Sequence, residues 1–287
     1  MKPPWESASL SHGRVAPRRI LPYHEAVDER LADTPSPSAG GGANSGVSAV
    51  ATSGDETPHG SGRRRRMVRR LANLLLVVGG LVLAFPFWSA AYARVAQDRL
   101  ERRYAEATVS FAAVRRANEQ ELAALTRPEE RLNALAALYG RDLKPGDPLG
   151  HLTIPRLHLD RVVIEGAGGR EGLSPKSDTD LLRKGPVHYG TTALPGQDGP
   201  FAVAGHRTTY GAPFYHLNEL RQGDEIVVET PYARLTYRVA KVTTVAPDDV
   251  SVLYDRGYDL ILTTCTPLYS ARRRLIVWAT QEGFAFR

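Results

Sequence analysis

The sequence contains a single cysteine, Cys265, among its 287 residues. This excludes a disulfide within the chain, so a packed core must supply the stability. In a protein that faces the outside of a cell, an unpaired cysteine indicates intermolecular pairing or a reactive thiol. No two histidines have zinc-ligand spacing with cysteine or carboxylates, and no nucleotide-binding loop is present. We therefore expect neither a metal nor a cofactor.

Charged residues are absent from one long apolar stretch, residues 71–93, which contains no Asp, Glu, Lys or Arg. Its length meets the roughly 20 residues that a helix needs to cross a hydrocarbon core. Six arginines crowd into the preceding residues 63–70. Such clusters can bind nucleic acid, but beside a span Lys and Arg are retained on the cytoplasmic side. We predict a polybasic topogenic segment at 63–70, no nucleic-acid partner, and a single-pass protein of the cell membrane with its N-terminus in the cytoplasm.

Residues 1–62 contain few aromatics and no sustained apolar period. A segment of this kind cannot bury enough surface to offset its ordering entropy, so we predict a disordered cytoplasmic region. About 60 mostly polar residues ahead of the span, and the length of the span itself, argue against a cleaved signal peptide. The apolar segment is therefore predicted to remain as an anchor in the bilayer.

Residues 94–147 are predicted to form a helical stalk and linker. An apolar stripe recurs at steps of four and three, at Leu100, Tyr104, Ala107, Phe111 and Val114. It fails at Asn118, so docking of the stripe on the downstream domain is favoured over a coiled coil.

A second helix is expected near the end of this segment. Thr126 and Glu129 have the spacing of a capping box, Pro128 stands in the first turn, and Gly140 marks the end. As one continuous helix, residues 94–140 would hold the following domain up to about 50–70 Å from the bilayer, although Pro128 opposes full extension.

Residues 148–287 change in character to short apolar runs separated by Gly, Pro and Asp. Many short strands with few helices predict an all-β domain, a small closed barrel or a sandwich. Short helical turns fit Asp178–Arg183 and Pro213–Leu217. The predicted strands are His151–Ile154, Arg161–Glu165, Phe201–Ala204, Glu225–Thr230, Leu235–Val245, Leu260–Thr264 and Leu275–Thr280.

Two of these strands carry the candidate chemistry. Cys265 closes one apolar run, and Arg274 opens the next. If the two strands pair in antiparallel fashion, this thiol and this guanidinium face each other across the loop Thr266–Arg273. His206, a candidate proton carrier, follows the strand Phe201–Ala204. A nucleophile, a proton carrier and a cation are the parts of a covalent catalytic site.

Each candidate also has a purely structural interpretation. Cysteine is among the residues most often buried without function. Arg274 adjoins Arg272 and Arg273, and spacing does not choose among the three. His206 competes with the other histidines of this region, His151, His158, His188 and His216.

The motifs around these residues resemble the sortase family. The resemblance rests on Thr263-Thr264-Cys265-Thr266-Pro267 with Arg274 nine residues after the cysteine, and on Ala204-Gly205-His206-Arg207. The longer stretches 185–189, 194–197 and 205–214 are most similar to class E sortases of actinobacteria. The resemblance covers roughly residues 148–287 and selects Arg274, since the family's arginine precedes an apolar strand.

The resemblance implies a sortase-type closed barrel of about eight strands and a membrane-anchored cysteine transpeptidase. Cys265 would cleave a C-terminal sorting signal, LAxTG-like or LPxTG-like, between Thr and Gly to form a thioester. A peptidoglycan amine would then take the secreted protein. His206 would move the proton, Arg274 would hold the substrate carbonyl or its oxyanion, and Thr264 would help to position the substrate. The barrel would be extracellular.

Three alternatives remain beside this interpretation. A pilin-polymerising sortase would use a lysine of another pilin as acceptor. A cysteine protease would use water, but a papain-type enzyme places its cysteine before its histidine, in the reverse of the order here. A membrane-tethered barrel could bind peptides without catalysis.

Overall fold

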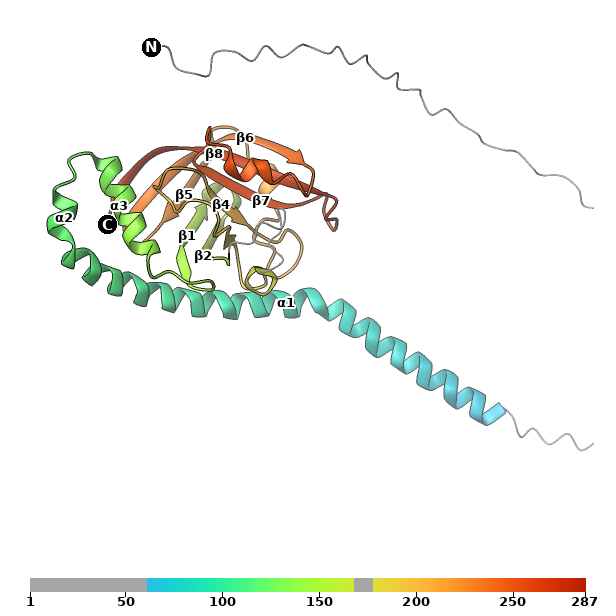
Figure 1. Cartoon of the computed structure of the whole chain (residues 1–287). Coiled ribbons are helices and arrows are strands. Elements are labelled where there is room, and N and C mark those ends of the chain that lie inside the picture. Colours follow the sequence, from blue (N-terminus) through green and yellow to red (C-terminus); the bar gives the residue numbers. More distant parts are fainter. Residues whose placement is uncertain (1–60, 168–177) are drawn as a thin grey trace, which may run out of the picture. The chain divides into compact units, whose positions relative to one another are not determined.

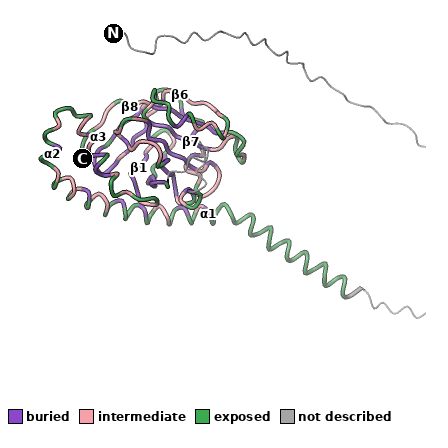
Figure 2. The backbone as a smooth tube through the Cα atoms, in the orientation of Figure 1, coloured by how far each residue is buried: buried purple, intermediate pink, exposed green. Residues whose placement is uncertain are grey.

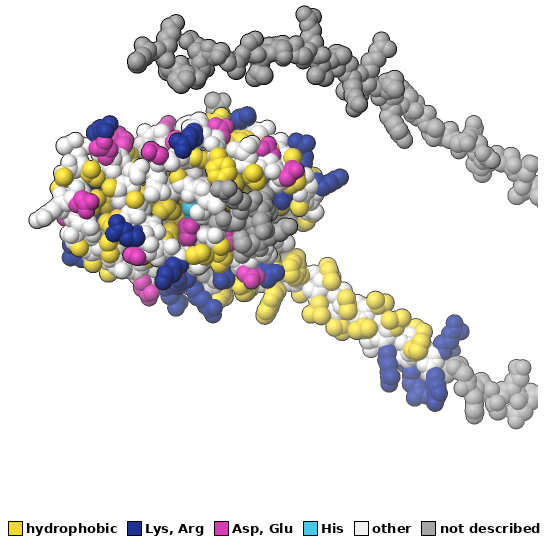
Figure 3. Space-filling view, in the orientation of Figure 1, with side chains coloured by type: hydrophobic (Ala, Val, Ile, Leu, Met, Phe, Trp, Pro, Cys, Tyr) yellow, Lys and Arg dark blue, Asp and Glu magenta, His cyan; other side chains and the backbone are white. Residues whose placement is uncertain are grey.

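The computed structural model describes residues 61–167 and 178–287. The predicted disordered region therefore lies outside the described residues, apart from its last two positions. Helix α1 (Ser61–Ala117) contains the apolar stretch, whose side chains are largely exposed along the part that leaves the barrel (Figure 3). Within the described part of the chain, this is the one helix long and apolar enough to cross a membrane.

Pro86 lies inside α1. Proline has no backbone N–H to donate, and its ring clashes with the carbonyl one turn earlier. Both effects bend helices. Ser89 donates a hydrogen bond from Oγ to the Pro86 carbonyl (3.0 Å). The helix changes direction before it reaches the barrel (Figure 1), as expected of a helix that contains a proline.

The C-terminal half of α1 packs lengthwise on the barrel (Figure 1). Leu100, Tyr104 and Phe111 of the predicted stripe are at most 6% exposed. The Gln97 amide donates to the Val162 carbonyl (3.2 Å) and accepts from the Val162 backbone N–H (2.9 Å). Docking of the stripe is confirmed. The spacer expectation is wrong, because burying this stripe holds the helix against the barrel.

Two further helices close this side of the domain, α2 (Glu119–Ala123) and α3 (Pro128–Gly140). The predicted second helix is present, with Pro128 in its first turn. Its N-cap is Arg127, and no side chain caps the first turn, so the predicted capping box is wrong. The helix is held by its buried face instead, formed by Leu132, Leu135, Ala136, Leu138 and Tyr139.

Eight strands form a closed barrel in the order β1-β2-β3-β4-β7-β8-β6-β5. The predicted all-β barrel is thus observed, in its closed form. The strands are β1 (Pro148–Ile154), β2 (Leu159–Ile164), β3 (Val187–His188), β4 (Phe201–Ala204), β5 (Glu225–Glu229), β6 (Ala233–Val245), β7 (Leu260–Thr266) and β8 (Arg273–Phe286).

Several strand ends lie one to three residues from their predicted positions, and the largest differences are at β3 and β8. β3 has two residues, too short to show an alternation, and was not predicted. β8 continues to Phe286, six residues beyond its predicted end. Among the short helical elements, α4 (Thr179–Leu182) lies within the predicted turn. The turn predicted at Pro213–Leu217 becomes a 3-10 helix only from Leu217 to Glu219. Two other 3-10 helices are Pro155–Leu157 and Val250–Tyr254.

Alternate residues of the strands enter two different apolar clusters among the described residues. Leu260 and Leu262 of β7 join the cluster that fills the barrel and continues under α3. Ile261 joins a second cluster on the other face of the sheet, covered by Leu100 of α1 and by Val252 and Leu253. Both faces of the sheet at β7 are therefore buried (Figure 2), so β7 is fixed on both sides.

Candidate active site

Three neighbouring strands, β4, β7 and β8, bring the predicted site residues to one end of the barrel. β7 and β8 are antiparallel, as expected, and Cys265 is the register partner of Arg274. Directly paired residues of antiparallel strands lie on the same face. Cys265 and Arg274 therefore share the face of the second apolar cluster, which contains their neighbours Ile261 and Ile276.

His206 reaches the same place from β4. This strand runs parallel to β7, with Ala204 opposite Thr263. Ala202 and Ala204 belong to the second cluster, and the alternation of side chains carries the next position on that face to His206. The strand order thus places all three predicted catalytic residues on one face.

Thr264 lies on the opposite face and is 3% exposed. Its Oγ1 donates a hydrogen bond to the Gly205 carbonyl (2.8 Å). This hydroxyl therefore contacts the backbone just ahead of His206, and its proposed role toward the substrate stays a prediction.

Arg207 connects the histidine segment to the cysteine strand, a role that the sequence did not suggest. Its Nη1 donates to the Cys265 carbonyl (3.2 Å) and to Thr266 Oγ1 (2.8 Å), and its Nη2 donates to Asn218 Oδ1 (2.7 Å). The side chain is 7% exposed, and this burial lowers the pKa of Arg207. The only signal in the sequence was its place directly after His206.

Tyr189 lies beneath the cysteine strand. Its hydroxyl shares a 2.8 Å hydrogen bond with Thr263 Oγ1, two residues before the cysteine. Burial raises the pKa of Tyr189 far above its usual range; the nearby charge of Arg274 opposes this shift and that of Cys265 adds to it. The phenol therefore stays neutral, and its hydrogen bond joins it to the cysteine strand.

The surroundings of His206 favour the neutral ring. Burial lowers the pKa of His206, and the guanidinium of Arg183 lowers it further. The Nε2 atom is buried without a hydrogen-bond partner among the described residues. A buried nitrogen without a partner is uncommon in folded proteins, and here it belongs to a candidate proton carrier.

The structure separates Arg274 from its neighbours. Arg272 and Arg273 are exposed, whereas Arg274 is 7% exposed, and its Nη1 donates to the Ala271 carbonyl (2.8 Å). Its position opposite Cys265 also distinguishes it.

Three of the four competing histidines have partners of their own. His151 contacts Glu101 and Asp160 (both 3.2 Å). His188 contacts Glu165 (2.8 Å), and the exposed His216 contacts Glu219 (2.6 Å). His158 stands at the end of the first 3-10 helix, in a left-handed conformation.

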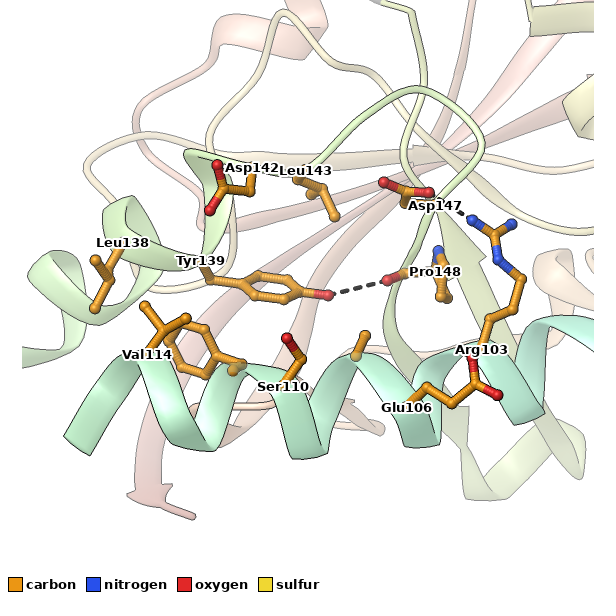
Figure 4. A pocket seen from close by; sticks show the side chains of 12 residues that line it. Arg103, Glu106, Ser110, Val114, Leu138, Tyr139, Asp142, Leu143, Asp147 and Pro148 are labelled. Atoms are coloured by element: carbon orange, nitrogen blue, oxygen red, sulfur yellow. Dashed lines mark hydrogen bonds and ion pairs between the residues drawn. The ribbon is translucent and has the colours of Figure 1, made fainter. Parts of the chain in front are cut away.

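A separate cavity of about 340 Å³ lies between α1, α3 and the start of β1 (Figure 4). Tyr139 Oη donates to the Pro148 carbonyl (3.0 Å), and Arg103 pairs with Asp147 (2.6 Å) at its edge. None of Cys265, His206 and Arg274 lines it.

The closed eight-stranded barrel pairs a cysteine with an arginine on adjacent strands and has a histidine after a third. These residues are the parts of a covalent site with a cysteine nucleophile. Residues 152–282 match the sortase domain family. The chain is 39% identical to sortase SrtE1 of Streptomyces coelicolor over 151 residues. This alignment covers 47% of this chain and 40% of SrtE1. It is 30% identical to sortase SrtE2 of the same organism over 244 residues. This alignment covers 76% of this chain and 86% of SrtE2.

A crystal structure of sortase E1 from Streptomyces coelicolor, with a tripeptide in the active site, is 33% identical to this chain. The superposition covers 50% of this chain and 94% of the sortase E1 chain, with a TM-score of 0.43. From the sequence match to SrtE2 over most of both proteins, the chain belongs to the sortase family of cysteine transpeptidases.

Proposed function

We propose that this chain is a membrane-anchored, class E-like sortase that joins secreted proteins to peptidoglycan. The observation that carries the proposal is the register pairing of Cys265 with Arg274, with His206 on the same face. The domain that does this work is proposed to comprise residues 148–287.

In the first half of the proposed reaction, Cys265 Sγ attacks the carbonyl carbon of Thr in a sorting signal. The Thr–Gly amide bond breaks, and His206 gives a proton to the leaving amine. Only the thiolate is a competent nucleophile. A cation across the strand pair stabilises negative charge, first on sulfur and then on the carbonyl oxygen, an effect typically worth several kcal/mol in the transition state.

In the second half, an amine of peptidoglycan attacks the thioester and gives its proton to His206, and the thiolate leaves. The histidine must therefore carry a proton when the cysteine is ionised. Because burial and Arg183 lower the pKa of His206, only a small fraction of the enzyme carries this pair of charges at neutral pH. Slow turnover is the consequence.

The topology fits a substrate that arrives from the membrane. The arginines at 63–70 favour a cytoplasmic N-terminus, with residues 71–93 crossing the bilayer. The barrel then lies outside the cell, where secreted proteins with an LAxTG-like or LPxTG-like signal emerge and where cell-wall amines are found. Thr264 helps to position the substrate in this proposal, and its hydroxyl is bonded to the Gly205 carbonyl just ahead of His206.

Mass spectrometry of the full chain in lipid nanodiscs tests the proposal. The enzyme is incubated with Leu-Ala-x-Thr-Gly or Leu-Pro-x-Thr-Gly peptides and an amine acceptor. We expect cleavage at Thr–Gly with an amine-linked product, absent in Cys265→Ala. A free acid alone, with amine in excess, would indicate a hydrolase, and neither product nor trapped thioester would indicate a peptide-binding barrel. Preference for a pilin lysine over a peptidoglycan amine would indicate a polymerising sortase.

A further inference from the structure

The loop that follows His206 places one aromatic ring between the proposed proton carrier and α1. The Tyr210 and His206 ring centroids lie 5.4 Å apart, with their planes 32° from parallel. On its other sides, Tyr210 meets Phe85 (6.2 Å) and Tyr92 (6.4 Å) of α1 edge to face. Arg183 lies 5.7 Å from the same ring. Four side chains from three parts of the chain thus converge on Tyr210.

The backbone of this loop is held in an unusual shape. Tyr210, Gly211 and Ala212 all have positive φ angles, of 52°, 76° and 43°. Residues other than glycine adopt this region at a cost, and such strain persists only where the surroundings over-determine it. A Cβ atom at Gly211 would stand 3.4 Å from Ala93 Cβ, so the loop lies close against α1. The helix is therefore part of what holds Tyr210 in place.

The His206 ring has no hydrogen bond among the described residues, and its Nε2 is buried without a partner. In many hydrolases a carboxylate orients the catalytic histidine. Here the ring contact of His206 is with the tilted ring of Tyr210. The nearby charge is the guanidinium of Arg183, which acts on both rings.

We propose that Tyr210 is a positioning residue for His206, and that the C-terminal end of the apolar stretch of α1, through Phe85 and Tyr92, holds Tyr210 in place. This inference rests on the proposed function of His206. Helix α1 then helps to position the proton carrier, because Tyr210 contacts both the helix and His206.

The test uses the full chain in lipid nanodiscs and five variants, one of which combines two of the others. Tyr210→Ala removes the ring, and Tyr210→Phe keeps it without its hydroxyl. A double variant, Phe85→Ala with Tyr92→Ala, removes the helix side of the contact. The matched control is Phe286→Ala, because Phe286 is a half-exposed ring with contacts to Phe284 and Arg131 at the far end of β8.

We expect Tyr210→Ala to lower kcat about tenfold or more with little change in KM, because a misplaced catalytic group costs rate more than binding. The helix variant should lower kcat in the same way, and Tyr210→Phe and Phe286→Ala should not. When Tyr210→Ala is added to the helix variant, the loss of kcat should be smaller than the product of the two separate losses. Both changes remove the same contact between α1 and Tyr210.

A second measurement does not depend on transpeptidation. Titration of the His206 ring by NMR should show its pKa rising toward the usual value in Tyr210→Ala and in the helix variant, because both open the ring to water. It should not move in Phe286→Ala. An unchanged kcat and an unchanged His206 titration in Tyr210→Ala would overturn the inference. If the wild-type chain forms no amine-linked product, the proposed function is wrong, and the titration still decides whether Tyr210 and α1 position His206.

Discussion

Two aromatic groups, one near each end of β8, differ in whether their polar ring atoms are hydrogen-bonded. Near the end of β8, the hydroxyls of Tyr139 and Tyr232 each donate to a proline carbonyl, at 3.0 and 2.7 Å. In the group at the other end, the ring of His206 packs against Tyr210, and its buried Nε2 has no partner among the described residues. Buried polar atoms are normally satisfied. In these two groups, the tyrosine hydroxyls that support the fold are bonded, and the ring nitrogen that we propose takes part in the reaction is not.

The largest expected effect is at the reactive end. Cys265→Ala should abolish transpeptidation, because loss of a nucleophile costs on the order of 10⁶-fold in kcat. The melting temperature should change little, since the side chain is only partly buried. Product formation by mass spectrometry and thermal unfolding measure the two quantities. Substantial remaining activity, or a collapse in stability, would remove the distinction between the two ends.

Phe111 tests the structural end. It is 5% exposed, and its ring lies 5.2 Å from Tyr139 and 6.2 Å from Tyr232. Phe111→Ala should lower the free energy of unfolding by about 3–5 kcal/mol and leave kcat of the folded enzyme unchanged. Denaturant unfolding measures this change. Val109→Ala, at an exposed site on the same helix, is the control and should change stability by less than about 0.5 kcal/mol.

Arg207 tests the link between the histidine and cysteine segments. Arg207→Met removes the donors to the Cys265 carbonyl and to Asn218. We expect kcat to fall about 100-fold through misplacement of the nucleophile, with a smaller change in KM. Arg221→Met, at an exposed position, is the control. An equal loss of kcat in both variants would mean that the effect is one of overall charge.

The smallest expected effect concerns pH. Arg183→Gln removes a cation that disfavours protonated His206, so the pKa of His206 should rise. The acid limb of the pH–rate profile then moves to higher pH, and the plateau rises, because more enzyme carries a protonated histidine with an ionised cysteine. Arg183→Lys keeps the charge and should keep the profile. A shifted limb without a higher plateau would mean that His206 acts first as a neutral base.

The sequence predicted those elements whose pattern is local. Seven strands follow from apolar runs bounded by Gly, Pro and Asp, and the pairing of Cys265 with Arg274 follows from two such runs in succession. β3 escaped prediction because two residues show no alternation. The Thr126–Glu129 capping box failed because burial of the apolar face of α3, a tertiary effect, holds this helix without a side-chain cap.

The candidate site was predictable only in part, for a similar reason. Cys265, His206 and Arg274 stand at strand ends, where sequence patterns place them. Arg207 and Tyr210 act through contacts with segments far away in the chain, β7 and α1. No periodicity in the sequence records such contacts. The same holds for Thr264, whose hydroxyl is bonded to the Gly205 carbonyl.

Helix α1 runs without a break from its apolar stretch onto the side of the barrel. No coil separates the two parts, so if the apolar part spans a bilayer, the barrel has no free swivel. The barrel then diffuses in the plane of the membrane with its height and tilt relative to the bilayer fixed. Encounters with other membrane-bound molecules are a search in two dimensions. A partner that presents its peptide at another height or angle must change its own conformation to reach the enzyme.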